Sequence, residues 1–232
     1  MLVCVPLLMS WACAESGLPK VPRIPVAAVP VVVPVHATAP VPTVLSIVPR
    51  AKWDPTPRAV GVLYRGRLGD IYRTIVIHHS DFIDPPGPLA IKDYHVEVSR
   101  FGDIGYHFVI GKDGSVYEAR SLTRMGAHAG ATREAARGTG RDLDPDWGAI
   151  GICLDGLFDE KLPPPAQLAA LALLVDDLKK RFPRIDRVIG HREVRAGVEG
   201  RGLHAIGPPT ACPGERLFRW LDAGGLAATP TP

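Results

Sequence analysis

The chain has 232 residues, of which 46% are hydrophobic and 22% are charged. This length fits one or two domains of roughly 150 residues each, and this composition excludes a wholly disordered chain. The net charge of +3 is too small to indicate a nucleic-acid-binding protein.

The chain begins with a short apolar segment at residues 2–14, which is too short to span a bilayer as a helix. The segment ends in Ala12-Cys13-Ala14, the small-x-small pattern of a signal-peptidase site. We therefore predict a signal peptide at 1–14 and export to the periplasm or the extracellular space. Two alternatives remain open, namely membrane anchoring through a lipidated Cys13 and a disordered or buried N-terminal tail.

Eight prolines lie between Pro19 and Pro49. Each proline fixes φ, removes a backbone donor and favours extended geometry in the residue before it. We predict a Pro-rich, polyproline II-like linker at 15–46, a folded domain at 47–226 and a short tail at 227–232.

Within the folded domain, apolar and β-branched runs alternate with segments of helical periodicity. Asp113-Gly114 is typical of a tight hairpin turn, 84–88 reads as a Pro-rich loop, and the Gly-rich segment 126–147 reads as a long loop. Helices are predicted at 89–100 and 167–182, and strands at 71–78, 105–111, 115–119, 149–154 and 186–190. This alternation predicts a single α/β domain with a mixed central β-sheet flanked by helices.

Two histidines directly follow apolar strand runs, at strand ends where side chains leave the core: His78 after TIVI and His191 after RVIG. Cys212 follows later, in a turn-rich stretch. Two imidazoles and one thiolate suit zinc and leave a fourth position open for water, whose pKa zinc lowers to about 7. His191 lies 113 residues after His78, and Cys212 lies 21 residues after His191, so spacing alone is weak support for a metal site.

Six motifs carry a resemblance to a known family, and they occur in this order: TIVIHHS, DIGYHFVIGKDGSVYEAR, AHAG, AIGICLDGLF, VIGHREV and TACPGERL. The chain resembles the zinc N-acetylmuramoyl-L-alanine amidases of type 2, which include the peptidoglycan recognition proteins. The resemblance spans about 48–222 and implies the type 2 amidase fold.

The resemblance also implies site residues. The metal ligands of a single zinc ion would be His78, His191 and Cys212. Tyr106 would lie beside the metal, and Thr210 would hydrogen-bond the oxyanion or the attacking water. His128 would line the substrate groove. His79 is a further candidate for substrate binding, with a structural role as the alternative.

The identity of the general base is left open by the sequence. Some branches of the family use a Glu on the strand that matches 150–155, where this chain has Cys153 and Asp155 on one face. Asp155 is therefore a candidate catalytic residue, with a turn-capping carboxylate as the alternative and the Tyr106 phenol as a rival. Cys153 reads as a small core residue. We predict that His95 is a packing or surface histidine and that His107 is structural.

The resemblance implies a zinc-dependent hydrolase that cleaves the amide bond between N-acetylmuramic acid and L-alanine in peptidoglycan. The alternative is a non-catalytic module that binds peptidoglycan or muropeptides; such relatives commonly replace the cysteine, which is retained here as Cys212. A remoter alternative is an amidase of small acyl-amino acids. Residues 195–209 look expanded relative to the family and could form a groove wall or a lid, and residues 131–147 also look expanded. We expect a monomer.

Overall fold

The computed structural model describes residues 39–57, 59–84, 86–137, 143–206 and 209–228. They belong to one compact unit, Thr38–Pro232. The predicted signal peptide, Cys13, most of the predicted linker and residues 229–232 of the predicted tail lie outside the described residues. None of the described helices combines the length and the apolar character needed to cross a membrane.

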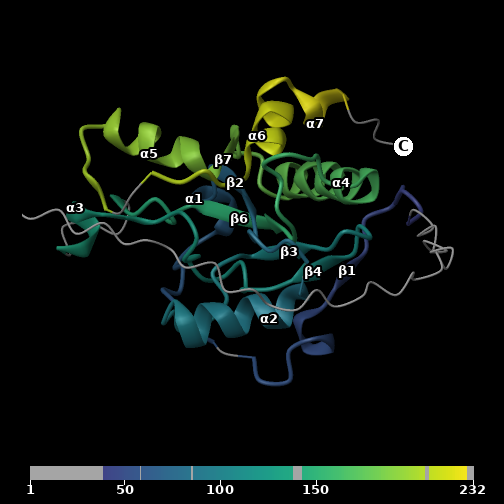
Figure 1. The fold of residues 1–232 in the computed structure, drawn as a ribbon. Coiled ribbons are helices and arrows are strands. Elements are labelled where there is room, and N and C mark those ends of the chain that lie inside the picture. The colour runs from purple at the N-terminus through teal and green to yellow at the C-terminus, as the bar shows by residue number, and fades with distance from the viewer. Residues whose placement is uncertain (1–38, 58, 85, 138–142, 207–208, 229–232) are drawn as a thin grey trace, which may run out of the picture. The chain divides into compact units, whose positions relative to one another are not determined.

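A six-stranded sheet lies at the centre of this unit, with the strand order β1-β4-β3-β6-β2-β7 (Figure 1). Its strands are β1 (Ile47–Val48), β2 (Thr74–His79), β3 (Phe108–Ile110), β4 (Val116–Glu118), β6 (Ala149–Leu154) and β7 (Arg187–Gly190). β3 and β4 form the predicted antiparallel hairpin, and all other neighbouring pairs are parallel. The predicted mixed central sheet is therefore confirmed.

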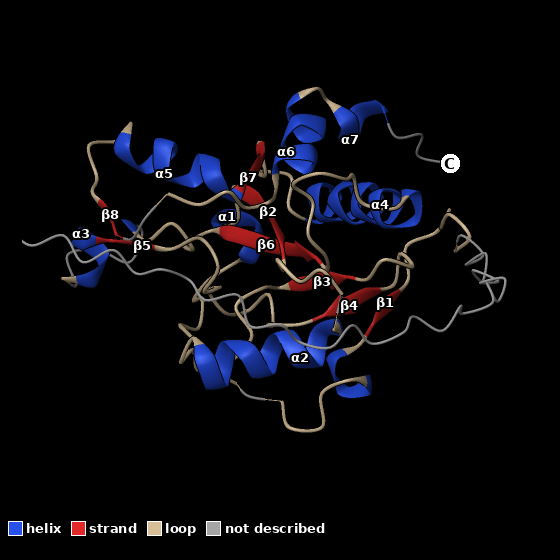
Figure 2. Ribbon diagram, in the orientation of Figure 1, coloured by secondary structure: helices blue, strands red, loops and turns tan. Residues whose placement is uncertain are grey.

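Helices cover both faces of the sheet, and Figure 2 shows α2 and α4 on opposite sides of it. The helical elements are η1 (Arg50–Lys52), α1 (Leu68–Ile71), α2 (Gly87–Asp93), the π-helix η2 (Tyr94–Val98), α3 (Arg133–Ala136), α4 (Pro165–Arg181), α5 (His191–Glu199), α6 (Glu215–Asp222) and α7 (Gly225–Ala228). The predicted architecture, a mixed sheet flanked by helices, is confirmed.

Alternation along the strands divides the core into two sides. Ile75 and Ile77 of β2 belong to the large cluster that includes Leu171 and Leu174 of α4. Val76, which points the opposite way, packs with Val194 and Val198 of α5. A third cluster, on the same side of the sheet as Val76, includes Ile91 of α2 and Cys153 of β6. Cys153 is fully buried, as expected of a core residue.

Helix α4, predicted at 167–182, runs from Pro165 to Arg181, so it starts two residues earlier than predicted and ends one residue earlier. Pro165 is its first residue, where the missing backbone donor costs nothing, and Phe182 caps it immediately before Pro183. The strand β6 covers the predicted residues 149–154 without a shift.

Other predicted boundaries were wrong. The strand predicted at 71–78 starts at Thr74, because Leu68–Ile71 forms α1. The loop predicted at 84–88 ends earlier, because α2 already begins at Gly87. The long loop predicted at 126–147 contains β5 (Ala131–Thr132) and α3, and β5 pairs in a two-stranded sheet with β8 (Ala205–Ile206).

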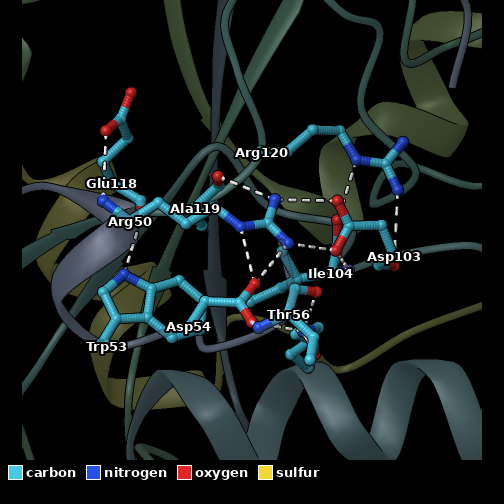
Figure 3. A network of polar contacts seen from close by, with 10 residues as sticks. Arg50, Trp53, Asp54, Thr56, Asp103, Ile104, Glu118, Ala119 and Arg120 are labelled. Carbon is cyan, nitrogen blue, oxygen red and sulfur yellow. Dashed lines mark hydrogen bonds and ion pairs between the residues drawn. The ribbon is translucent and has the colours of Figure 1, made fainter. Parts of the chain in front are cut away.

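A buried network of charges joins the segment after β1 to the rest of the domain (Figure 3). Arg50 donates to both carboxylate oxygens of Asp103, at 2.6 and 2.8 Å, and its Nε donates to Asp54 at 2.8 Å. Lys92 of α2 donates to the other oxygen of Asp54 at 2.5 Å. The side chains of Asp54 and Asp103 are fully buried. The network therefore ties three separate parts of the chain together near the loop that carries Tyr106.

Candidate functional site

The site forms where two parallel strands end side by side. β2 ends with His78 and His79, and its neighbour β7 ends at Gly190, directly before His191 at the start of α5. Ile77 is in register with Gly190, so the next residues of the two strands meet, and the rings of His78 and His191 lie 4.6 Å apart. Cys212 comes from the loop before α6.

His78, His191 and Cys212 offer three ligand atoms that all lie within 4.8 Å of one another. The Sγ atom of Cys212 lies 3.6 Å from Nδ1 of His78. In a tetrahedral zinc site with bonds of about 2.0–2.3 Å, ligand atoms are roughly 3.5 Å apart. A movement of about 1 Å would bring all three atoms into zinc-binding range, so the residues fit this metal.

Burial keeps both imidazoles neutral and able to bind a metal. Burial, with His191 and His128 nearby, lowers the pKa of His78 well below its usual value. Burial also lowers the pKa of His191 to about 4. In the absence of a metal, burial raises the pKa of the Cys212 thiol to about 12. A bound zinc ion would reverse this preference, because a coordinating thiol loses its proton.

The surroundings of Cys212 can support a thiolate. The backbone N–H of His79 donates to Sγ at 3.4 Å, and the backbone N–H of Cys212 donates to the hydroxyl oxygen of Thr210 at 3.1 Å. Thr210 and His79 both line the same cavity as Cys212. The hydroxyl proton of Thr210 is thus free to be donated elsewhere.

Tyr106 lies beside the candidate metal ligands, with its ring 5.0 Å from that of His78. Burial, with Cys153 and Cys212 nearby, raises the pKa of its hydroxyl well above the usual value, so the group is a hydrogen-bond donor at neutral pH. The segment around Tyr106 is fixed by Arg120, which is buried and donates to the carbonyl oxygens of Ile104 and Met125 at 2.8 and 2.9 Å.

Two adjoining cavities form a groove across the site. One has a volume of about 360 Å³ and the other about 510 Å³, and both are lined by His95, Tyr106 and His191. His128 lines the larger cavity, together with the apolar side chains of Phe101 and Ile206. The metal-ligand cluster therefore opens onto a groove with room for an extended substrate.

The two segments that look expanded in the sequence meet at this groove. Ala131 of β5 is in register with Ile206 of β8, and both line the larger cavity. The pairing is reinforced by His204, whose Nδ1 lies 2.8 Å from a carboxylate oxygen of Glu134. The strands β5 and β8, one from each segment, thus build one wall together.

Asp155 is not among the residues that line the groove. One of its carboxylate oxygens accepts a hydrogen bond from the Ser80 hydroxyl at 2.7 Å, and the other accepts from the Gly87 amide at 2.8 Å. Gly87 is the first residue of α2. These contacts match the turn-capping alternative and leave neither oxygen without a partner.

The sequence analysis missed three groove residues. It gave His95 another role, and it did not single out Phe101 or Asp146. His95 lines both cavities, and its Nδ1 accepts a hydrogen bond from the Gly105 amide at 3.0 Å. Phe101 and Asp146 line the larger cavity. His95 lies one helical turn before Ser99, which also lines the larger cavity. This spacing places both residues on one side of the helix, and it is the sequence signal that could have identified His95 as a groove residue. His107, by contrast, bonds only to backbone atoms, of Gly151 and Arg124, in the contacts described.

Comparison with known proteins gives a consistent result. The sequence model of the N-acetylmuramoyl-L-alanine amidase family matches residues 68–215. Peptidoglycan recognition protein 1 of Mus musculus is 30% identical over 188 residues, which cover 76% of this chain and 86% of that protein.

Two solved structures share the fold. The Drosophila peptidoglycan recognition protein SD is 26% identical and has a TM-score of 0.56, over 77% of this chain and 94% of that one. The endolysin N-acetylmuramoyl-L-alanine amidase LysCS from Clostridium intestinale is 24% identical and has a TM-score of 0.55, over 82% of this chain and 98% of that one.

Proposed function

Because the chain belongs to the N-acetylmuramoyl-L-alanine amidase family, we propose that it is a zinc-dependent hydrolase of peptidoglycan. It would cleave the amide bond between N-acetylmuramic acid and L-alanine, in the intact wall or in soluble muropeptides. The observation that carries this proposal is the cluster of His78, His191 and Cys212, of which His191 and Cys212 line the groove and His78 is buried beside them.

The three clustered residues would hold one zinc ion. When bound, zinc supplies Lewis acidity, which activates a water molecule and polarises a carbonyl oxygen. Three protein ligands leave the fourth position of a tetrahedral ion for water or substrate, the pattern of catalytic rather than structural zinc sites. His79 supports the cluster through its backbone N–H, which donates to the sulfur of Cys212.

Tyr106 would donate a hydrogen bond to the oxygen on which charge develops as the amide is attacked. Its hydroxyl keeps its proton at neutral pH and has Cys212 nearby, and its ring lies 5.0 Å from that of His78. Thr210 would be a second donor, because its oxygen already accepts from the Cys212 amide and its proton remains available. Donors fixed before the reaction stabilise such charge at little reorganisation cost.

His128 and His79 would contact the substrate on either side of the cluster, since each lines one of the two cavities. We assign no proton transfer to Asp155, because both of its oxygens are engaged in hydrogen bonds with Ser80 and Gly87. Its role would be to hold the start of α2 against the end of β2.

We also infer that the chain is exported as a monomer, by way of the signal peptide predicted at 1–14. Anchoring through Cys13 is the alternative. The mass of the mature N-terminus of the expressed protein tests both: cleavage after Ala14 gives the soluble form, and an acylated Cys13 gives the anchored one.

A muropeptide digest followed by mass spectrometry, with metal analysis of the same preparation, tests the proposed activity. We expect about one zinc per chain, release of the stem peptide from the sugar, and loss of that release after chelation. A zinc-loaded chain that binds muropeptides and leaves them intact would instead be the non-catalytic recognition module. Cleavage that continues at full rate without metal would contradict both.

A further inference from the structure

The two ring nitrogens of His78 have different partners. Nδ1 lies 3.6 Å from Sγ of Cys212, inside the candidate metal cluster. Nε2 lies 3.1 Å from Nδ1 of His128, outside that cluster. Both rings are buried, with exposed residue fractions of 1% for His78 and 7% for His128. His78 can therefore ligate an ion through Nδ1 while its Nε2 is held by the protein.

The choice of ligating nitrogen determines where the proton lies on each ring. A neutral imidazole carries one proton, and the nitrogen that binds a metal is the unprotonated one. With Nδ1 of His78 directed at the cluster, its proton lies on Nε2 and is donated to Nδ1 of His128. His128 accepts at Nδ1 and therefore carries its own proton on Nε2.

The Nε2 atom of His128 lies close to a buried carboxylate. Nε2 is itself buried and makes no hydrogen bond of good geometry with the described residues, but Oδ1 of Asp146 lies 3.4 Å away, and the backbone of Ala149 is also close to the ring. The same oxygen accepts from the backbone N–H groups of His128 and Ala129, at 2.8 and 3.0 Å. Asp146 is 4% exposed. It anchors the loop that carries His128 and faces its ring.

Two glycines make the space that the His128 ring occupies. A Cβ atom on Gly151 of β6 would lie 2.4 Å from Cδ2 of His128, and a Cβ atom on Gly126 would lie equally close. Any larger residue at either position would clash with the ring and force it to move. The backbone thus fixes the position of this ring from two sides.

We propose that His128, through its contact with Nε2 of His78, and Asp146, which holds the His128 loop by two backbone hydrogen bonds and lies beside the His128 ring, form an outer shell that fixes the tautomer and the orientation of His78 for zinc binding. The inference rests on the proposed function, because it requires a metal ion in the cluster. Such a shell makes a ligating imidazole more basic and holds its plane, and its loss typically weakens metal binding about 10–100-fold. His128 and Asp146 are thus positioning residues that act through His78, in addition to lining the groove.

Zinc affinity of the full chain, measured by competition with a chromophoric chelator, tests the proposal without reference to turnover. The variant His128→Phe removes the acceptor for the Nε2–H of His78, and we expect its zinc affinity to fall about 10–100-fold. His128→Gln keeps a side-chain acceptor and is expected to recover part of that loss. Asp146→Asn keeps an acceptor for the two backbone amides but removes the charge, and we expect a smaller loss.

His107 offers a matched control, because it is a buried histidine next to His128 whose nitrogens bond to backbone atoms instead of to His78. The variant His107→Gln is expected to bind zinc as tightly as the wild type, even where it unfolds at a lower temperature. A folded His128→Phe variant with wild-type zinc affinity would overturn the proposal. A wild-type chain that takes up no zinc would instead overturn the proposed function.

Long-range ¹H–¹⁵N NMR of the zinc-loaded wild type gives a second measurement that depends on no variant. We expect both His78 and His128 to be protonated at Nε2 and His78 to be bound to the metal through Nδ1. Metal ligation of His78 through Nε2, or a proton on Nδ1 of His128, would refute the inference even if every variant failed to fold.

Discussion

The backbone N–H of His79 donates a hydrogen bond to the sulfur of Cys212, at a distance of 3.4 Å, across a separation of 133 positions in the chain. The contact joins the end of β2, a strand of the six-stranded sheet, to the loop before α6. It places a donor on the one candidate ligand that must lose a proton to bind zinc, and so favours the thiolate.

Replacing Cys212 is expected to remove the metal and spare the fold. Cys212→Ser should lower the zinc content of the purified protein to well under one ion per chain and abolish muropeptide cleavage, because a hydroxyl is a poor zinc ligand. Circular dichroism should be unchanged, since the serine oxygen can still accept from His79. Metal analysis of Cys153→Ala, which changes a buried cysteine outside the cluster, is the control. Wild-type zinc content in Cys212→Ser would refute the ligand assignment.

Tyr106→Phe tests the hydroxyl as a donor to developing negative charge. We expect kcat to fall by about 10²–10³ with KM little changed, the usual effect of deleting one such donor. Zinc content should stay at the wild-type level, which separates this effect from metal loss. Tyr117→Phe, which removes a hydroxyl from the tyrosine of β4, should leave kcat unchanged. Equal activity of Tyr106→Phe and the wild type would exclude this role.

The groove wall formed by β5 and β8 should affect substrate binding more than chemistry. Ile206 is exposed and lines the larger cavity, so Ile206→Asp should raise KM for muropeptides several-fold, as burying a carboxylate against substrate is costly. Leu162 has almost the same exposure, 47% against 48%, and lines neither cavity of the groove. The KM of Leu162→Asp should therefore match that of the wild type. An equal rise of KM in both variants would contradict the assignment of Ile206 to the substrate groove.

The buried network around Asp54 makes stability dependent on pH. Burial opposes ionisation of Asp54, but hydrogen bonds from Lys92 and Arg50 outweigh it and lower its pKa. The pKa of Asp54 in the folded state lies below its unfolded value of about 3.9. The stability that ionised Asp54 contributes to the fold is therefore present above the unfolded pKa and is lost as the pH falls through the folded pKa. Denaturant unfolding between pH 3 and 7 should show this loss.

Asp54→Ala should cost about 3–5 kcal/mol at pH 7, since it leaves the buried Lys92 ammonium without its carboxylate. It should also flatten the pH dependence below pH 4. The exposed pair of Asp176 and Lys180 has the same 2.5 Å separation, so Asp176→Ala is a control for which we expect little change. Similar losses in both variants would show that burial is not the cause.

The fold could be predicted from the sequence where local pattern and burial agree. β6 has six consecutive buried residues between clear breaks, and it was predicted without a shift. The family prediction, made from six ordered motifs, is confirmed by the match over residues 68–215. Helix α5 was missed, because Gly197 and Gly200 lower helix propensity and the segment reads as an irregular insertion.

Other features depend on contacts between distant segments. β5 and β8 have two residues each, too few for any periodicity, and they form because 131–132 meets 205–206. No sequence motif includes Asp146. The sequence does not indicate its contact with His128, because the two residues lie far apart along the chain. The geometry of His95 depends on a bond to Gly105, ten positions away. Such contacts follow from the tertiary structure and leave no local trace in the sequence.

The two-stranded sheet of β5 and β8 has a consequence for engineering. Its strands come from segments more than 70 positions apart and complete each other's backbone hydrogen bonds. A chimera that transplants either segment alone into a shorter homologue would leave an open strand edge beside the active groove, prone to pairing with another chain. The two segments are therefore one transferable module and should be exchanged together.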